Sequence, residues 1–202
     1  INNVEILSVD ENGLIDLDEL EGRLDKTDGR VLVSVMLANN ETGVIQPISE
    51  VSNIAKKYGA MVHTDAIQAC GKIKLDREAL GVDFISLSAH KIGGPQGVGA
   101  LIVNEEVPFE PMIRGGGQER GRRAGTENIA GIVGFGVASA IVADLIHITK
   151  TRALRDLLER GINKILPGSI VCGEKIDRLP NTSSIFMPGV NSETQVIKFD
   201  LN

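Results

Sequence analysis

An uninterrupted apolar run, RVLVSVMLA at positions 30–38, is the feature that most restricts the possible folds of this chain. Its β-branched content predicts a strand buried on both faces. Further apolar segments at 60–66, 83–90 and 99–104 are predicted as strands, and 48–59 as an amphipathic helix closed by Gly59. Strands alternating with helices at this spacing predict an α/β fold with a mostly parallel sheet covered by helices.

The segments on either side extend this organisation. Residues 4–9 are predicted to form a short strand and about 16–24 a helix. A long helix is expected from about Glu127 to Lys150, continuing to Ile165. SIVCG and NTSSIFMPG then indicate two strands of a second, smaller unit.

Composition and charge exclude several kinds of protein. The net charge of −6 and the lack of a long basic run make nucleic acid an unexpected partner. The sequence contains no stretch of 18 apolar residues, so no membrane span is predicted. Cys70 and Cys172 form no CxxC motif, and histidines are not clustered, which argues against a disulfide framework or a zinc site and favours a cytosol-like compartment. The chain starts without Met or a signal-peptide pattern and stops without a tail, so we expect it to be a piece of a longer protein.

Polar residues follow three of the predicted strands, as NNETG (39–43), DAIQ (65–68) and SAHKIGG (88–94). In parallel sheets, ligands bind at the carboxyl ends of the strands. Lys91 places an ammonium at the end of an apolar strand, which is costly unless the charge is paired or neutralised. Either this side chain reaches solvent, or its amine has a use.

The residue types in these loops suit pyridoxal 5'-phosphate. A lysine at a strand end can form a Schiff base with an aldehyde cofactor. Asp65 is placed for the carboxylate that the ring nitrogen requires, and Gln68 for a donor to the phenolic oxygen. Ser88 and His90 lie two residues apart and share a face while the strand persists, so both can hydrogen-bond the phosphate.

Each of these residues also has a plainer interpretation. Lys91 alone is more often a lysine whose ammonium reaches solvent, and Asp65 a helix N-cap. Asn40 has the alternative role of capping a turn. His63 and His147 have no motif partner and are interpreted as structural.

Five motifs in order carry a resemblance that covers nearly the whole chain: NNETG, HTDAIQ, SAHKIGGPQGVG, GGGQERGRRAGTEN and NTSSI. Together they resemble the cysteine desulfurases, a branch of the fold-type I pyridoxal-phosphate enzymes related to class V aminotransferases. The resemblance implies an incomplete cofactor-binding large domain over residues 1–147. Residues 148–202 would begin a small C-terminal α+β domain.

The resemblance also implies residue roles. Lys91 would form the Schiff base, Asp65 would pair with the pyridinium, Gln68 would contact the phenolic oxygen, Ser88 and His90 would hold the phosphate, and Asn40 would lie near the ring and the substrate. Thr126 matches a threonine that reaches the partner subunit's phosphate, near the N-terminus of the long helix, which implies a homodimer with shared sites.

The implied reaction converts L-cysteine to L-alanine and an enzyme persulfide, whose sulfur passes to an iron–sulfur scaffold protein in the bacterial cytoplasm or the mitochondrial matrix. The family's catalytic cysteine lies downstream of NTSSI, and Cys70 and Cys172 offer no clear context for a nucleophile. The chain as given is therefore expected to be inactive. Two alternatives are another class V aminotransferase-like enzyme and a non-catalytic assembly module.

Overall fold

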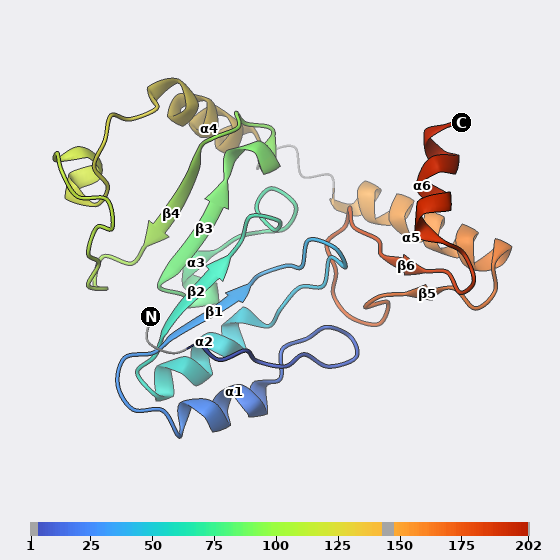
Figure 1. Cartoon of the computed structure of the whole chain (residues 1–202), viewed down its shortest axis with the longest axis horizontal. Helices are drawn as coiled ribbons and strands as arrows, with labels where there is room; N and C mark the ends of the chain where they lie inside the picture. Colours follow the sequence, from blue (N-terminus) through green and yellow to red (C-terminus); the bar gives the residue numbers. More distant parts are fainter. Residues whose placement is uncertain (1–3, 143–147, 202) are drawn as a thin grey trace.

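A four-stranded sheet organises the first part of the chain in this computed structural model, which describes residues 4–142 and 148–201 (Figure 1). Its strands are β1 (Leu32–Met36), β2 (Met61–Asp65), β3 (Phe84–Ser88) and β4 (Gly99–Val103), in that order across the sheet. The first three are parallel, and β4 runs antiparallel to β3. The predicted α/β fold with a mostly parallel sheet is confirmed.

Two helices, α1 (Leu17–Leu24) and α2 (Ile48–Lys57), lie against one face of this sheet (Figure 1), and the short α3 (Arg77–Leu80) precedes β3. Asp16 caps α1, because its Oδ1 accepts the Glu19 N–H at 2.9 Å. Gly59 follows α2 with a φ of +65°, in agreement with the predicted helix end. The apolar side chains between these layers form the main core, which includes Leu20, Val33, Val51, Val62 and Ile85.

Two strand predictions need correction. β1 is not buried on both faces, because Val33 is 5% exposed while Leu32 and Met36 are 51% and 42% exposed. The helices α1 and α2 cover only one face of the strand. Residues 4–9 do not form a strand: within the described residues, only Val9 pairs, through an antiparallel bridge to Ile15. Because no neighbouring strand pairs with this segment, its apolar residues stay open to solvent, and Ile6 is 84% exposed.

The second unit contains α5 (Ile148–Ile165), the antiparallel pair β5 (Ile170–Val171) and β6 (Ile185–Phe186), and α6 (Ser192–Asp200). The two predicted strands are therefore confirmed. The predicted long helix corresponds to α4 (Ile129–Val142) and α5, while residues 143–147, which include His147, lie outside the described residues. No helix within 4–142 or 148–201 is both long and apolar enough to cross a membrane.

The loop after β1 joins the two units. Val44 forms an antiparallel bridge with Arg178, and the Leu179 N–H donates to the Gly43 carbonyl oxygen at 2.7 Å. Gly43 adopts a φ of +77°, and a Cβ on it would lie 2.8 Å from the Thr182 Cβ. Glycine is thus required by both the backbone conformation and the close approach.

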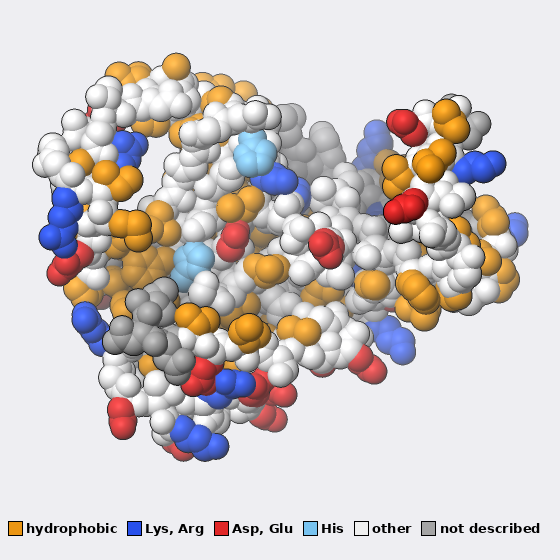
Figure 2. All heavy atoms as spheres, in the orientation of Figure 1, with side chains coloured by type: hydrophobic (Ala, Val, Ile, Leu, Met, Phe, Trp, Pro, Cys, Tyr) orange, Lys and Arg blue, Asp and Glu red, His pale blue; other side chains and the backbone are white. Residues whose placement is uncertain are grey.

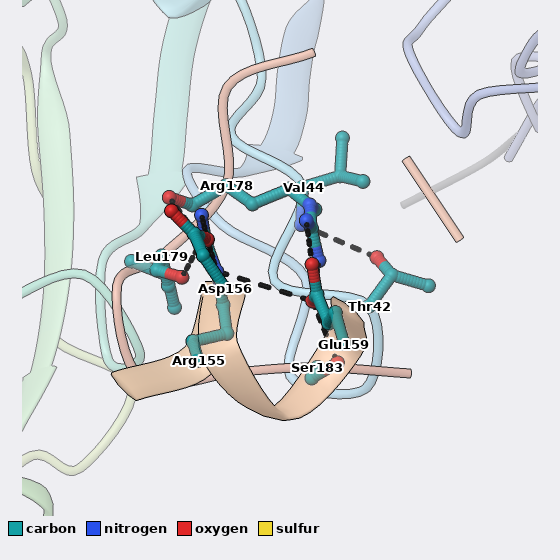
Figure 3. A network of polar contacts seen from close by, with 8 residues as sticks. All are labelled: Thr42, Val44, Arg155, Asp156, Glu159, Arg178, Leu179 and Ser183. Atoms are coloured by element: carbon teal, nitrogen blue, oxygen red, sulfur yellow. Dashed lines mark hydrogen bonds and ion pairs between the residues drawn. The ribbon is translucent and has the colours of Figure 1, made fainter. Parts of the chain in front are cut away.

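A buried polar network holds this junction (Figure 3). The Arg178 guanidinium makes two parallel contacts with the Glu159 carboxylate, of 2.8 Å and 3.0 Å. The Ser183 hydroxyl donates to the same carboxylate at 2.7 Å, and Arg155 Nη1 donates to the Leu179 carbonyl oxygen at 2.8 Å. Helix α5 is thereby fixed to the segment that bridges Val44.

Candidate active site

Asp65, Ser88, His90 and Lys91, four of the residues predicted for the site, lie at the carboxyl edge of the sheet. Asp65 is the last residue of β2, and Lys91 lies in η1 (Ala89–Ile92), a 3₁₀ turn directly after β3. Asp65 pairs with Ser86 in the parallel register of β2 and β3. Both side chains therefore belong to the same edge of the sheet, as the polar loops after the strands predicted.

Lys91 stands on a turn that is built into the fold. The turn η1 begins at the fully buried Ala89, closes at Gly93 in the left-handed conformation, and packs against α4. The Lys91 side chain itself is exposed, and within 4–142 and 148–201 it forms no ion pair. Its amine is accessible on a firmly held backbone.

Ser88 and His90 lie next to each other, but not for the reason predicted. The strand ends at Ser88, so the two residues do not share a strand face. The change to a 3₁₀ turn instead brings the Ser88 Oγ to 2.8 Å from the His90 Nδ1. This hydrogen bond leaves the other ring nitrogen of the exposed His90 side chain available to a ligand.

Asp65 begins a turn and keeps one carboxylate oxygen open. Its Oδ1 accepts the Ile67 N–H at 2.8 Å, which is an Asx turn rather than a helix N-cap. In the described part of the chain, Oδ2 makes no hydrogen bond. This oxygen is therefore open to a hydrogen-bond donor.

Gln68 is held by a residue that sequence analysis missed. The Lys72 ammonium donates to the Gln68 Oε1 at 2.7 Å. Burial lowers the pKa of Lys72, and the positive charge of Lys91 lowers it further, so the two ammonium groups lie near enough to repel. The spacing of four residues indicates a side-chain pair only in a helix, whereas residues 67–72 form turns in which Gly71 has a φ of +75°, so no local pattern signalled this contact.

His63 occupies the same sheet face as Asp65, two residues before it. Its Nδ1 lies 2.8 Å from the Ser34 Oγ and its Nε2 lies 2.9 Å from the Ser86 Oγ, so the ring bridges β1 and β3. Burial lowers the pKa of His63, while the charge of Asp65 acts in the opposite direction. With both nitrogens engaged, His63 has the structural role that was predicted. The side chains of both described histidines, in pale blue, are visible on the face of the molecule that Figure 2 shows.

Asn40 and Thr126 are not hydrogen-bonded to the described residues at the edge of the sheet. Both are exposed, and neither side chain makes a hydrogen bond to any residue the structure describes. Thr126 precedes α4, which begins at Ile129 with the Asn128 Oδ1 accepting the Gly131 N–H at 3.1 Å. Thr126 thus lies three residues before the first residue of α4, near the helix N-terminus, as predicted.

The chemistry of the donor set fits pyridoxal 5'-phosphate. The edge offers an accessible amine for the aldehyde, a carboxylate oxygen for the ring nitrogen, and a hydroxyl with an imidazole for the phosphate. Among the described residues, no three His, Cys, Asp or Glu side chains form a metal-binding group.

The chain belongs to the class V aminotransferases, whose family model it matches over residues 2–200. Within the family it is related to the cysteine desulfurases. It is 46% identical over 201 residues to a cysteine desulfurase of Sinorhizobium fredii, covering 98% of this chain and 51% of that protein. It is 44% identical to the cysteine desulfurase NifS of Azotobacter vinelandii over 192 residues, covering 94% of this chain and 47% of that protein.

A solved structure shows the same fold. The NifS-like protein from Rickettsia africae has a TM-score of 0.94 and 43% sequence identity, covering 99% of this chain and 56% of that one. The predicted fold-type I architecture is therefore confirmed. The chain spans about half the length of the curated relatives it matches.

Proposed function

We propose that the protein containing this chain is a pyridoxal-phosphate-dependent cysteine desulfurase, which converts L-cysteine to L-alanine and transfers the sulfur to an enzyme cysteine. The observation that carries this proposal is the placement of Asp65 and Lys91 at one edge of the sheet, with the hydrogen-bonded pair Ser88 and His90 directly before Lys91. The similarity to cysteine desulfurases selects this reaction among those that such an edge can support.

Pyridoxal phosphate, when bound, would supply an electron sink for a carbanion at the substrate Cα. Asp65 would hold a proton on the ring nitrogen through its open Oδ2, and Lys91 would bind the aldehyde through its amine. The Lys91 Nζ would also move a proton from the cysteine Cα. Gln68 would donate to the phenolic oxygen.

The phosphate would lie against Ser88 and His90, which share one hydrogen bond and would offer it either the Ser88 hydroxyl or the His90 Nε2–H as a donor, depending on the tautomer. Asn40, in the loop after β1, would lie beside the ring and the substrate. Thr126 is exposed and has no hydrogen bond to a described residue of its own chain. This leaves its hydroxyl free for the phosphate of a second subunit, so we propose a homodimer with shared sites.

Neither cysteine of this chain suits the sulfur-accepting role. Burial raises the pKa of the Cys70 thiol, which disfavours the reactive thiolate. Cys172 belongs to the β5–β6 hairpin, where its N–H donates to the Ser184 carbonyl oxygen at 2.9 Å. We therefore propose that the accepting thiol is a cysteine outside residues 1–202, and that an iron–sulfur scaffold protein receives the sulfur. The two free thiols are compatible with the proposed bacterial cytoplasm or mitochondrial matrix.

The test uses the full-length protein loaded with pyridoxal phosphate and reduced with borohydride. Peptide mass analysis should find the added cofactor mass on Lys91, and L-cysteine should yield equal amounts of alanine and sulfide in the presence of a thiol reductant. Lys74→Ala is a control for this labelling: the Lys74 side chain is 88% exposed, so the variant should still carry the label on Lys91. Cofactor on another lysine would contradict the site. Labelling of Lys91 without alanine formation would indicate another class V enzyme, and no labelling at all would favour an assembly module.

A further inference from the structure

Lys72 lies beside the proposed cofactor site but has no role in the reaction described above. Its ammonium contacts the Gln68 Oε1 at 2.7 Å, and its side chain is partly buried. The charge of Lys91 contributes to lowering the pKa of Lys72, after burial. Lys72 therefore contacts Gln68 and lies close enough to Lys91 for the two positive charges to interact.

The contact between Lys72 and Gln68 determines which end of the amide is free. A lysine ammonium has three donors and no acceptor, so it can hydrogen-bond only the oxygen of the amide. With Oε1 occupied by Lys72, the Gln68 NH₂ group is the end that remains for another partner. The orientation of a glutamine amide is set by such hydrogen bonds, because the two ends are nearly the same in shape.

We propose that Lys72 is a positioning residue, which fixes Gln68 as a hydrogen-bond donor toward the phenolic oxygen of pyridoxal phosphate. This inference rests on the proposed function, since it assumes that the cofactor binds at Lys91. An amide free to rotate would present its oxygen part of the time, and two acceptor oxygens facing each other repel. By holding the Gln68 Oε1, the Lys72 ammonium prevents the flipped orientation of the amide.

The test measures the dissociation constant of pyridoxal phosphate by equilibrium titration in full-length Lys91→Ala protein, where binding is non-covalent and the repulsion from Lys91 is absent. In this background, Lys72→Met should weaken binding about fivefold, as expected for one hydrogen bond. Gln68→Ala should weaken it to a similar degree, and the double variant should bind no more weakly than Gln68→Ala alone. Lys72→Arg should retain most of the affinity, because arginine also offers only donors.

Two controls separate this role from a general effect of charge or folding. Lys74→Met removes an exposed charge two residues away and should leave the dissociation constant unchanged. Gln68→Glu keeps an oxygen for Lys72 but offers no donor to the cofactor, so it should bind at least as weakly as Gln68→Ala. This variant tests the orientation even where Lys72→Met fails to fold.

The outcomes are distinct. If the losses from Lys72→Met and Gln68→Ala multiply in the double variant, Lys72 acts independently of Gln68 and the inference is wrong. Binding of Gln68→Glu with the affinity of the parent would show that the amide oxygen faces the cofactor, which also overturns it. No binding in the parent Lys91→Ala protein would overturn the proposed cofactor site and this inference together.

Discussion

Gly134, in α4, lies directly against Pro95, in the loop that follows Lys91. A Cβ on Gly134 would be 3.0 Å from both the Cδ and the Cγ of Pro95. Contacts this short are tighter than normal carbon packing, so the helix approaches the loop as closely as it does only because residue 134 has no side chain. The helix therefore supports the backbone from which the Lys91 amine extends.

This contact predicts opposite effects for two substitutions in one helix. Gly134→Ala should destabilise the protein by about 1 to 3 kcal/mol through overpacking. Gly136→Ala is the matched control, because its Cβ would meet nothing within 4 Å, and it should stabilise by up to about 1 kcal/mol through helix propensity. Urea denaturation measures both, and equal effects of the two substitutions would refute this account of the α4 packing.

The ion pair between Glu159 and Arg178 predicts sensitivity to mutation and acid. Burial favours the neutral acid, but the hydrogen bonds and charges of Arg178 and its neighbours outweigh burial and lower the pKa of Glu159 below its ordinary 4.5. A lowered carboxyl pKa stabilises the fold above pH 4.5, and this contribution is lost as the pH falls through the folded-state value. The free energy of unfolding, measured from pH 7 to pH 3, should decrease over that range.

Glu159→Gln should lower the free energy of unfolding at pH 7 by about 3 kcal/mol, because it leaves the Arg178 charge buried and unpaired. The variant should also lose less stability on acidification than the parent. Glu110→Gln is the matched control, since Glu110 pairs with Arg114 in an exposed i,i+4 contact with side chains 88% and 73% exposed. It should leave the free energy of unfolding unchanged, and an equal loss in both variants would contradict the role of burial.

His63 predicts a second effect of pH, at higher values. Burial holds the pKa of His63 below its ordinary 6.5, so the folded protein favours the neutral ring. As the pH falls below 6.5, the unfolded chain takes up a proton that the folded one resists, and stability is lost. The free energy of unfolding should therefore fall between pH 7.5 and 5.5 by more in the parent than in His63→Gln. The same pH dependence in both proteins would assign the effect to other groups.

Thr126 predicts complementation between two inactive subunits. In full-length protein, mixing Thr126→Ala and Lys91→Ala subunits gives mixed dimers in which one site carries both changes and the other carries neither. Desulfurase activity should therefore appear on mixing, at about one working site per mixed dimer, provided that Thr126→Ala alone is weak. If Thr126 serves its own subunit instead, each mixed site carries one change and mixing restores nothing.

The sequence was sufficient for the parts of the structure that local patterns determine. The apolar runs predicted β2 and β3 within one or two residues, and the polar segments after them placed Asp65 and Lys91 at one edge. The pattern could not show that β1 has an uncovered face, because the same apolar run serves a strand covered on one side or on both.

Contacts between distant segments could not be predicted. Neither the Glu159–Arg178 pair nor the bridge from Val44 to Arg178 has a local pattern, since the partners come from separate elements that only folding brings together. The hydrogen bond between Ser88 and His90 was missed for a different reason. It depends on the 3₁₀ turn that begins at Ala89, and a turn of this kind cannot be told from a continuing strand in the apolar pattern.

The hydrogen bonds of the loop after β1 also constrain the order of folding. Gly43 and Ile45 are bonded to Leu179 and Asp177, which leave the ribosome long after β1, β2 and β3 have been synthesised. The three parallel strands pair with neighbours close in sequence and can assemble early, whereas closing the distant contact costs more chain entropy and occurs late. During synthesis, we therefore expect the edge that carries Asp65 and Lys91 to form before the loop that carries Asn40 reaches its final position. If Asn40 serves the proposed cofactor site, that site would be completed only when the second unit has emerged.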